Sequence, residues 1–134
     1  MTDPGETVKT IEIRTAKLWR HPDGFVVVQM KPRVRETLDD ARELVEAGTR
    51  LAGTPNYALF VDLRAPFSMD PGVREFYARR AETKALALLI DSGFGRVAGN
   101  LFLSLNVPKF PTRLFTTEDD AVRWLKKVTK GASP

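Results

Sequence analysis

The chain has 134 residues, of which 43% are hydrophobic and 28% charged, as is usual for one soluble globular domain. It contains no cysteine, which excludes disulfides, cysteine nucleophiles and thiolate metal sites and fits a cytoplasmic protein. No apolar run reaches about 18 residues, so no membrane span is expected.

The formal net charge is +4, and the basic residues are scattered, many of them beside acids. The densest cluster, Lys126, Lys127 and Lys130, falls in the last turns of the final predicted helix, where cations complement the helix dipole. We therefore interpret the charge as a solvated surface and expect no nucleic-acid groove.

The first elements form a predicted antiparallel hairpin. Ile11–Trp19 alternates apolar and polar residues, as a half-buried strand does. His21–Gly24 contains proline and Asp-Gly and predicts a turn, and the β-branched run Phe25–Met30 predicts the returning strand.

A helix and a buried strand follow. Thr37 is the predicted N-cap, with Asp39 and Asp40 in the positive first turn, and Gly53–Asn56 ends the helix. The short apolar run Tyr57–Arg64 then predicts a strand buried on both faces, reached by a crossover connection.

The same unit is repeated once. A second helix is expected over Gly72–Glu82, with Asp70 or Ser68 as its cap and Pro71 at the first helical position. The apolar run Lys84–Asp91 predicts the next strand, parallel to and beside Tyr57–Arg64.

The last part of the chain predicts two helices and a short strand. Phe94–Leu105 is a third helix that is apolar on nearly every side, and Thr112–Phe115 is a short strand. Thr116 is expected to open the final helix, and Gly131 to end it. We expect one domain over residues 8–130, with a flexible leader at 1–7 and a tail at 131–134.

Several strings resemble the STAS domain, the family named for sulphate transporters and anti-sigma-factor antagonists. They are Leu59–Arg64, Ala87–Ile90, Gly99–Leu103 and, most specific, Leu114–Leu125. The likeness covers roughly residues 8–130 and is closest to stand-alone bacterial STAS and SEC14-like proteins. It implies an α/β fold, with a mixed sheet of about five strands, an N-terminal antiparallel hairpin and four helices mainly on one face.

The resemblance also implies a site of regulation. STAS antagonists are phosphorylated on a serine or threonine at the start of the helix after the central strand, where amide groups and the helix dipole act on the phosphate. Asp70 and Gly72 match that pattern, but Pro71 stands where the hydroxyl is expected. Ser68 is the nearby candidate phosphoacceptor.

The carboxyl ends of parallel strands share one rim, where ligands of such sheets usually bind. The side chains expected to form a docking surface there are Asp62, Arg64, Ser68, Asp70, Arg74 and Arg96. For Asp62, the alternative is a structural acid that bonds backbone amides or Arg64.

The third predicted helix has more apolar residues than one sheet can cover, and Leu103, Val107 and Phe110 remain as a patch. An exposed patch favours an interface, most simply a homodimer. The alternatives are that the adjacent connector covers it, or that an apolar ligand lies beneath the helix.

We therefore expect a non-catalytic regulatory or protein-interaction module of the bacterial cytoplasm, without a cofactor. The alternative is a small carrier of an apolar, lipid-like ligand, with a closed cavity between the third helix and the sheet. An enzyme is not expected, because His21 is the only histidine and lies in a turn, away from the strand ends. The pairs Asp39-Asp40 and Asp119-Asp120 fall in first turns of helices, where capping explains them.

Overall fold

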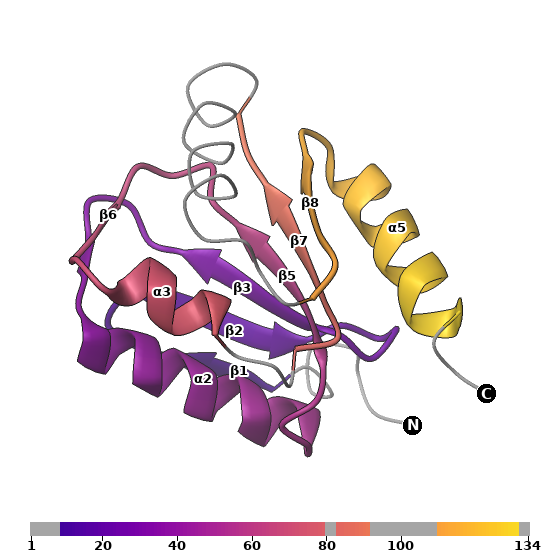
Figure 1. Cartoon of the computed structure of the whole chain (residues 1–134), viewed down its shortest axis with the longest axis horizontal. Coiled ribbons are helices and arrows are strands. Elements are labelled where there is room, and N and C mark those ends of the chain that lie inside the picture. The colour runs from indigo at the N-terminus through magenta and orange to yellow at the C-terminus, as the bar shows by residue number, and fades with distance from the viewer. Residues whose placement is uncertain (1–8, 80–82, 92–109, 132–134) are drawn as a thin grey trace.

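The computed structural model describes residues 9–79, 83–91 and 110–131, and a six-stranded mixed sheet lies at its centre (Figure 1). The strand order is β1-β2-β3-β5-β7-β8. The strands are β1 (Thr10–Glu12), β2 (Ala16–Arg20), β3 (Val26–Met30), β5 (Ala58–Asp62), β7 (Ala85–Leu89) and β8 (Thr112–Phe115).

Four of these strands, β3, β5, β7 and β8, run parallel to one another, and β2 is antiparallel to both of its neighbours. In the centre, Leu59 of β5 lies opposite Leu86 of β7. The prediction that the two apolar runs are parallel interior neighbours is therefore confirmed.

The sheet has one strand more than expected, because the predicted strand Ile11–Trp19 is two strands. The amide of Ile13 donates to the carbonyl of Ala16 (2.9 Å), which folds Arg14 and Thr15 into a tight connection between β1 and β2. Strand β1 therefore forms one edge of the sheet. The predicted hairpin over His21–Gly24 joins β2 to β3.

A second, two-stranded sheet lies beside the main one. It pairs β4 (Arg35–Glu36) with β6 (Ser68–Met69) in parallel. The three described helices are α2 (Leu38–Ala52), α3 (Val73–Ala78) and α5 (Glu118–Gly131). The predicted helix Phe94–Leu105 lies outside the described residues.

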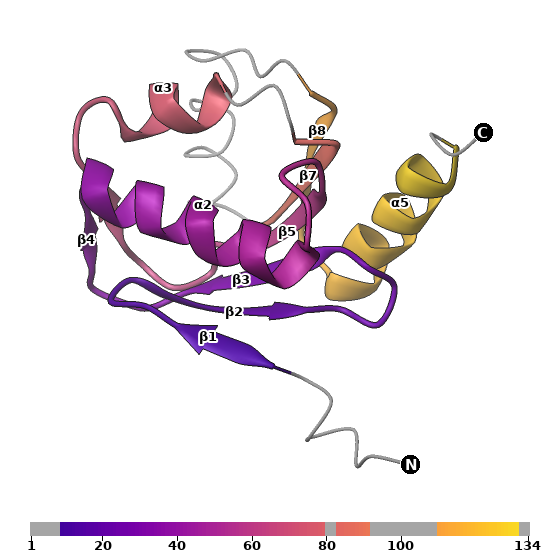
Figure 2. The ribbon, with the colours of Figure 1, turned by 90° about the horizontal axis from the view of Figure 1, so that it is seen from below.

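The helices cover both faces of the sheet, with α2 and α3 on one side and α5 on the other (Figure 2). The expectation of helices mainly on one face is corrected for α5. The physical reason is visible in β3, where Val26 and Val28 face one core and Val27 faces the other.

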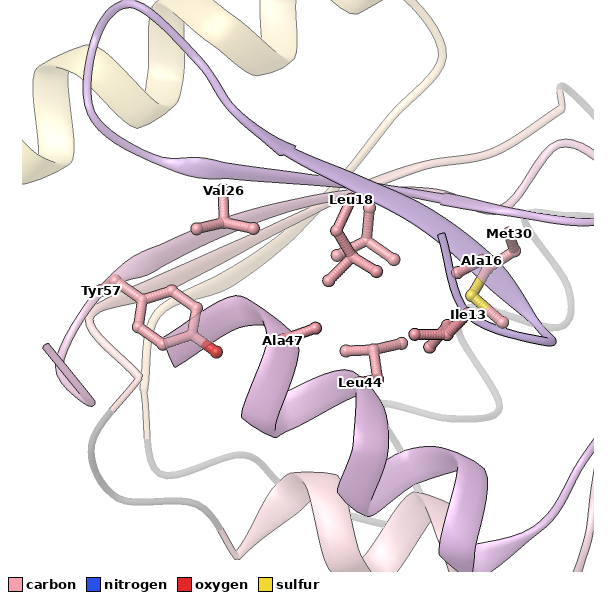
Figure 3. Packing of buried hydrophobic residues seen from close by; sticks show 9 residues of the cluster. Ile13, Ala16, Leu18, Val26, Met30, Leu44, Ala47 and Tyr57 are labelled. Atoms are coloured by element: carbon pink, nitrogen blue, oxygen red, sulfur yellow. The ribbon is translucent and has the colours of Figure 1, made fainter. Parts of the chain in front are cut away.

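The first core lies between the sheet and α2. Figure 3 shows Leu44 and Ala47 of α2 directed at the strands that carry Leu18 and Val26. The second core lies under α5, where Ala121 and Leu125 are fully buried against the sheet. It is completed by Phe25, which precedes β3, and by the strand residues Val27, Ala58, Phe60, Ala85, Ala87 and Leu89.

The ends of α2 are formed as the sequence predicts. The hydroxyl of Thr37 accepts a hydrogen bond from the amide of Asp40, whose carboxylate accepts one from the amide of Thr37, which completes a capping box. Gly53 ends the helix in the left-handed conformation (φ 77°).

Candidate functional site

Four polar residues form a row across the sheet near the carboxyl ends of β3 and β5. Glu12 lies opposite Lys17, Lys17 opposite Gln29, and Gln29 opposite Asp62, so that one register line crosses β1, β2, β3 and β5. We call Glu12, Lys17, Gln29 and Asp62 the polar row.

The polar row lies on the face of the sheet that carries α5. Two residues earlier on β3 and β5, the same face presents Val27 and Phe60, which belong to the core under α5. On β3 and β5, this face therefore changes from apolar to polar over two residues, towards the carboxyl ends of the strands. Among described helices, α5 packs on β5, β7 and β8, and Lys17 and Gln29 of the row are exposed.

A cleft of about 710 Å³ opens along the polar row. Its basic side chains are Lys17, Lys31 and Arg64, and its acids are Glu12 and Asp62. Sequence reasoning found only Asp62 and Arg64. Gln29 is the one polar residue of β3, but the pairing of Lys17 with Gln29 follows from the strand register and not from the sequence pattern.

The charges along the cleft are largely fixed in pairs. Arg64 holds Asp62 through its backbone amide (3.0 Å) and its guanidinium (3.0 and 2.8 Å). Lys31 donates to Glu12 (2.7 Å), and this ion pair lowers the pKa of Glu12. Lys17 is exposed and forms no ion pair with any described residue.

The structural alternative considered for Asp62 is thus observed, since Asp62 bonds both the backbone and the side chain of Arg64. The negative charges of Glu118, the first residue of α5, and of Asp91, shortly after β7, also interact favourably with the guanidinium of Arg64. Its pKa is raised, chiefly by the hydrogen bond to Asp62. Arg64 is therefore anchored at the rim shared by the strands.

The other predicted docking residues that the structure describes, Ser68, Asp70 and Arg74, do not line this cleft. Ser68 is exposed on β6 and donates its amide to the carbonyl of Val34 (3.0 Å), and Asp70 forms an ion pair with Arg35 of β4. Arg74 is exposed on α3. Arg96, Leu103 and Val107 lie outside the described residues, whereas Phe110 is described and half-buried.

The predicted start of the second helix needs correction. Neither Ser68 nor Asp70 caps α3, because Gly72 is the N-cap, in the left-handed conformation (φ 92°) and without a side-chain hydrogen bond. Pro71 therefore precedes the cap instead of opening the helix. α3 also ends at Ala78, short of the expected Glu82. Ser68 consequently lies in a strand and not at a helix terminus.

The sequence matches a family model described as a domain of unknown function, DUF7793, over residues 18–129. The chain belongs to this family. Among curated proteins, none is significantly similar to it.

The DUF7793 chain is similar in structure to an uncharacterized protein of the DUF3478 family from Shewanella loihica PV-4, described as having a SpoIIAA-like fold. The TM-score is 0.54 at 12% sequence identity, and the match covers 89% of this chain and 92% of the other. At this identity the likeness shows the fold alone. It supports the STAS-like fold that the sequence strings predicted.

A buried acidic network lies beside the two-stranded sheet of this DUF7793 domain. Glu36 is fully buried and accepts a hydrogen bond from the hydroxyl of Tyr77 on α3. Burial raises the pKa of Glu36 to about 7. Its Oε1 atom has no hydrogen-bond partner among the described residues. The sequence had not singled out Glu36.

The neighbouring carboxylate, Asp40, is in the opposite electrostatic state. Arg14 donates to both of its oxygens, one at 3.1 Å, and Thr37 donates from its amide and its hydroxyl (2.9 Å each). These bonds, that of Arg14 first, lower the pKa of Asp40 to about 2. Because Arg14 also donates to the carbonyl of Arg35, this network joins the β1–β2 connection, β4 and α2.

Within the described ranges, no group of three or more histidine, cysteine or acidic side chains is placed to hold a metal ion. No helix in those ranges combines the length and the apolar content needed to cross a bilayer. His21 lies in the hairpin turn, as predicted, and its ring stacks on Phe25 with centroids 4.3 Å apart.

Proposed function

We propose that this DUF7793 domain is a non-catalytic protein-interaction module whose partner docks along the polar row. The observation that carries the proposal is the continuous register line from Glu12 to Asp62, which on β3 and β5 directly follows the apolar core residues Val27 and Phe60. Polar side chains on such a face need solvent or a polar partner, since burial without partners is costly.

The arrangement of charge supports recognition more than chemistry. Asp62 is held rigidly by Arg64, and Lys31 and Glu12 neutralise each other across the cleft. Lys17 is left as an exposed cation in the middle of the row. Fixed charges of both signs give an interface register and specificity.

The shape of the cleft supports a polypeptide partner. It is open and its lining includes both signs of charge, whereas sites for apolar small molecules are concave and mostly apolar. The carrier alternative concerned the helix Phe94–Leu105, outside the described residues, and it stays a prediction. Mass spectrometry of the native protein, with or without a retained apolar ligand, tests it.

Affinity capture from the native host with quantitative mass spectrometry tests the interaction. The variant is Lys17→Glu, which reverses the exposed charge of the row. Its matched control is Arg42→Glu, the same reversal on the outer side of α2, where Arg42 is exposed and forms an ion pair with Asp39. The proposal expects a protein captured by wild type and the control and lost by Lys17→Glu. Equal capture by all three forms would contradict it.

Regulation through Ser68 remains a separate hypothesis. The hydroxyl is on an exposed residue of β6, next to the strand that carries Arg35. A phosphate there would meet the cation that now pairs with Asp70. Incubation with host lysate and ATP should label wild type and not Ser68→Ala; no label in either would remove the idea.

A further inference from the structure

Strand β8 forms the edge of the main sheet that lies opposite β1. In the order of the described strands β8 is last, and α5 runs beside it (Figure 1). A cleft of about 310 Å³ lies between β8 and α5. From this geometry we infer that the β8 edge binds an acidic segment of another protein as an added β-strand.

Among the described residues, some backbone groups of β8 have no strand partner. The carbonyls of Pro111 and Phe115 accept hydrogen bonds from β7, from Leu86 (2.8 Å) and Ile90 (2.9 Å). Since backbone groups of a strand alternate in direction, those of Thr112 and Leu114 point away from β7. Within the described part of the chain no strand pairs with them. An exposed edge of this kind is a template for strand addition.

The cleft beside this edge is basic. It is lined by three cations, Arg113, Arg123 and Lys127, against one carboxylate, Asp120, which pairs with Arg123 at 3.2 Å. Arg113 and Lys127 are exposed, and neither forms an ion pair with a described residue. The cleft therefore has two uncompensated positive charges, which acidic side chains would complement.

An aromatic pair gives the same cleft an apolar floor. The rings of Phe115 and Trp124 lie 5.6 Å apart between centroids, and both residues are only half-buried. The guanidinium of Arg113 lies 5.5 Å from the centre of the Phe115 ring. Tryptophan and arginine are among the residue types that most often dominate binding energy once a partner covers them.

The charge decides between the possible occupants. A second copy of this chain would bring the basic cleft towards itself, and like charges facing one another are destabilising. An acidic segment removes that repulsion and uses the outward backbone groups. Single-stranded nucleic acid would use the cations and rings, but it has no use for the paired donors and acceptors of Thr112 and Leu114.

The test uses the full chain and a fluorescent peptide of about eight residues that alternates Asp or Glu with Val or Thr. Fluorescence anisotropy at about 50 mM salt measures its binding. Two control peptides replace the acids with Lys or carry N-methyl groups on alternate amides. We expect binding of the acidic peptide, and weakening by about tenfold or more for each control.

Two protein variants locate the site. Arg113→Glu with Lys127→Glu should weaken binding about tenfold or more, whereas Arg42→Glu with Arg50→Glu, an equal charge change on α2, should leave it within about twofold. In NMR spectra, addition of the peptide should shift the backbone amide resonances of Thr112 and Leu114. This readout does not depend on the polar row, so failure of one surface leaves the other standing.

Four outcomes would overturn the inference. Equal binding of the acidic and N-methylated peptides would exclude strand addition. Equal weakening by both pairs of charge reversals would mean only a general charge effect. A wild-type dimer that protects the amides of Thr112 and Leu114 from hydrogen exchange, or tighter binding of a single-stranded oligonucleotide that competes with the peptide, would assign the edge to another occupant.

Discussion

The hydroxyl of Tyr77 on α3 donates a hydrogen bond to the buried carboxyl group of Glu36 on β4, 41 residues away in sequence. This bond ties α3 to the two-stranded sheet. Because burial raises the pKa of Glu36 to about 7, the folded chain keeps this group protonated at a pH where the unfolded chain has lost the proton.

Glu36 therefore makes stability depend on pH. Its ordinary pKa is 4.5, so the stabilising effect of the bound proton is complete below pH 4.5 and is lost as the pH rises to about 7. The loss across this window should be about 3 kcal/mol. The side chain of Glu36→Gln cannot ionise, so this variant should not lose that stability as the pH rises. Urea unfolding of both forms between pH 4.5 and 8 checks this, and parallel curves would show that Glu36 is not the group responsible.

Arg14 should affect the acid side of the profile. Asp40 has its pKa lowered to about 2 from 3.8, so the stability it contributes is present above pH 3.8 and is lost as the pH falls towards 2. Because Arg14 is half exposed and solvent screens its charge, Arg14→Gln should lower the free energy of unfolding only slightly at neutral pH. The difference from wild type should shrink towards pH 2. A constant difference at every pH would argue against the Arg14–Asp40 pair as its origin.

The first turn of α5 distinguishes two neighbouring threonines. The hydroxyl of Thr117 accepts a hydrogen bond from the amide of Asp120 (3.3 Å), whereas Thr116 was the residue expected to cap the helix. Thr117→Ala should lower the free energy of unfolding by about 1 kcal/mol, as loss of a cap does. Thr116→Ala is the matched control and should have little effect. Calorimetric unfolding of the two variants decides between them.

Gly48 of α2 lies close to the aromatic ring of Tyr57, the residue just before β5. A Cβ atom on Gly48 would lie 2.3 Å from the hydroxyl oxygen of Tyr57 and 3.0 Å from Cζ. Gly48→Ala should therefore destabilise the fold by about 1–2 kcal/mol, although alanine favours helices. Adding Tyr57→Phe removes the nearest atom and should recover part of the loss in thermal unfolding. No loss on Gly48→Ala would mean that the ring moves freely.

Local patterns in the sequence predicted much of this architecture. The two apolar runs, the turn at His21–Gly24 and the cap at Thr37 are each specified by neighbouring residues, and each is present. The break at Arg14 and the role of Glu36 were missed. The break is a short turn inside an alternating pattern, closed by the bond from Ile13 to Ala16, and Glu36 depends on Tyr77, which is distant in the chain; periodicity reports neither.

The candidate site was predictable only in part for the same reason. Asp62 and Arg64 are two residues apart and follow one strand, so sequence alone associates them with its end. Lys17 and Gln29 join them through strand pairing, which brings residues of separate strands into one row. Knowledge of the register was needed before the row could be recognised.

Site-specific photo-cross-linking in the native host is the most direct test of docking at the polar row. A photoreactive amino acid replaces Gln29, which is exposed in the row, or Glu46, which is exposed on α2 and serves as the control. We expect one defined protein adduct at Gln29, absent at Glu46 and abolished by Lys17→Glu. The same adducts at both positions, or none at Gln29, would contradict it.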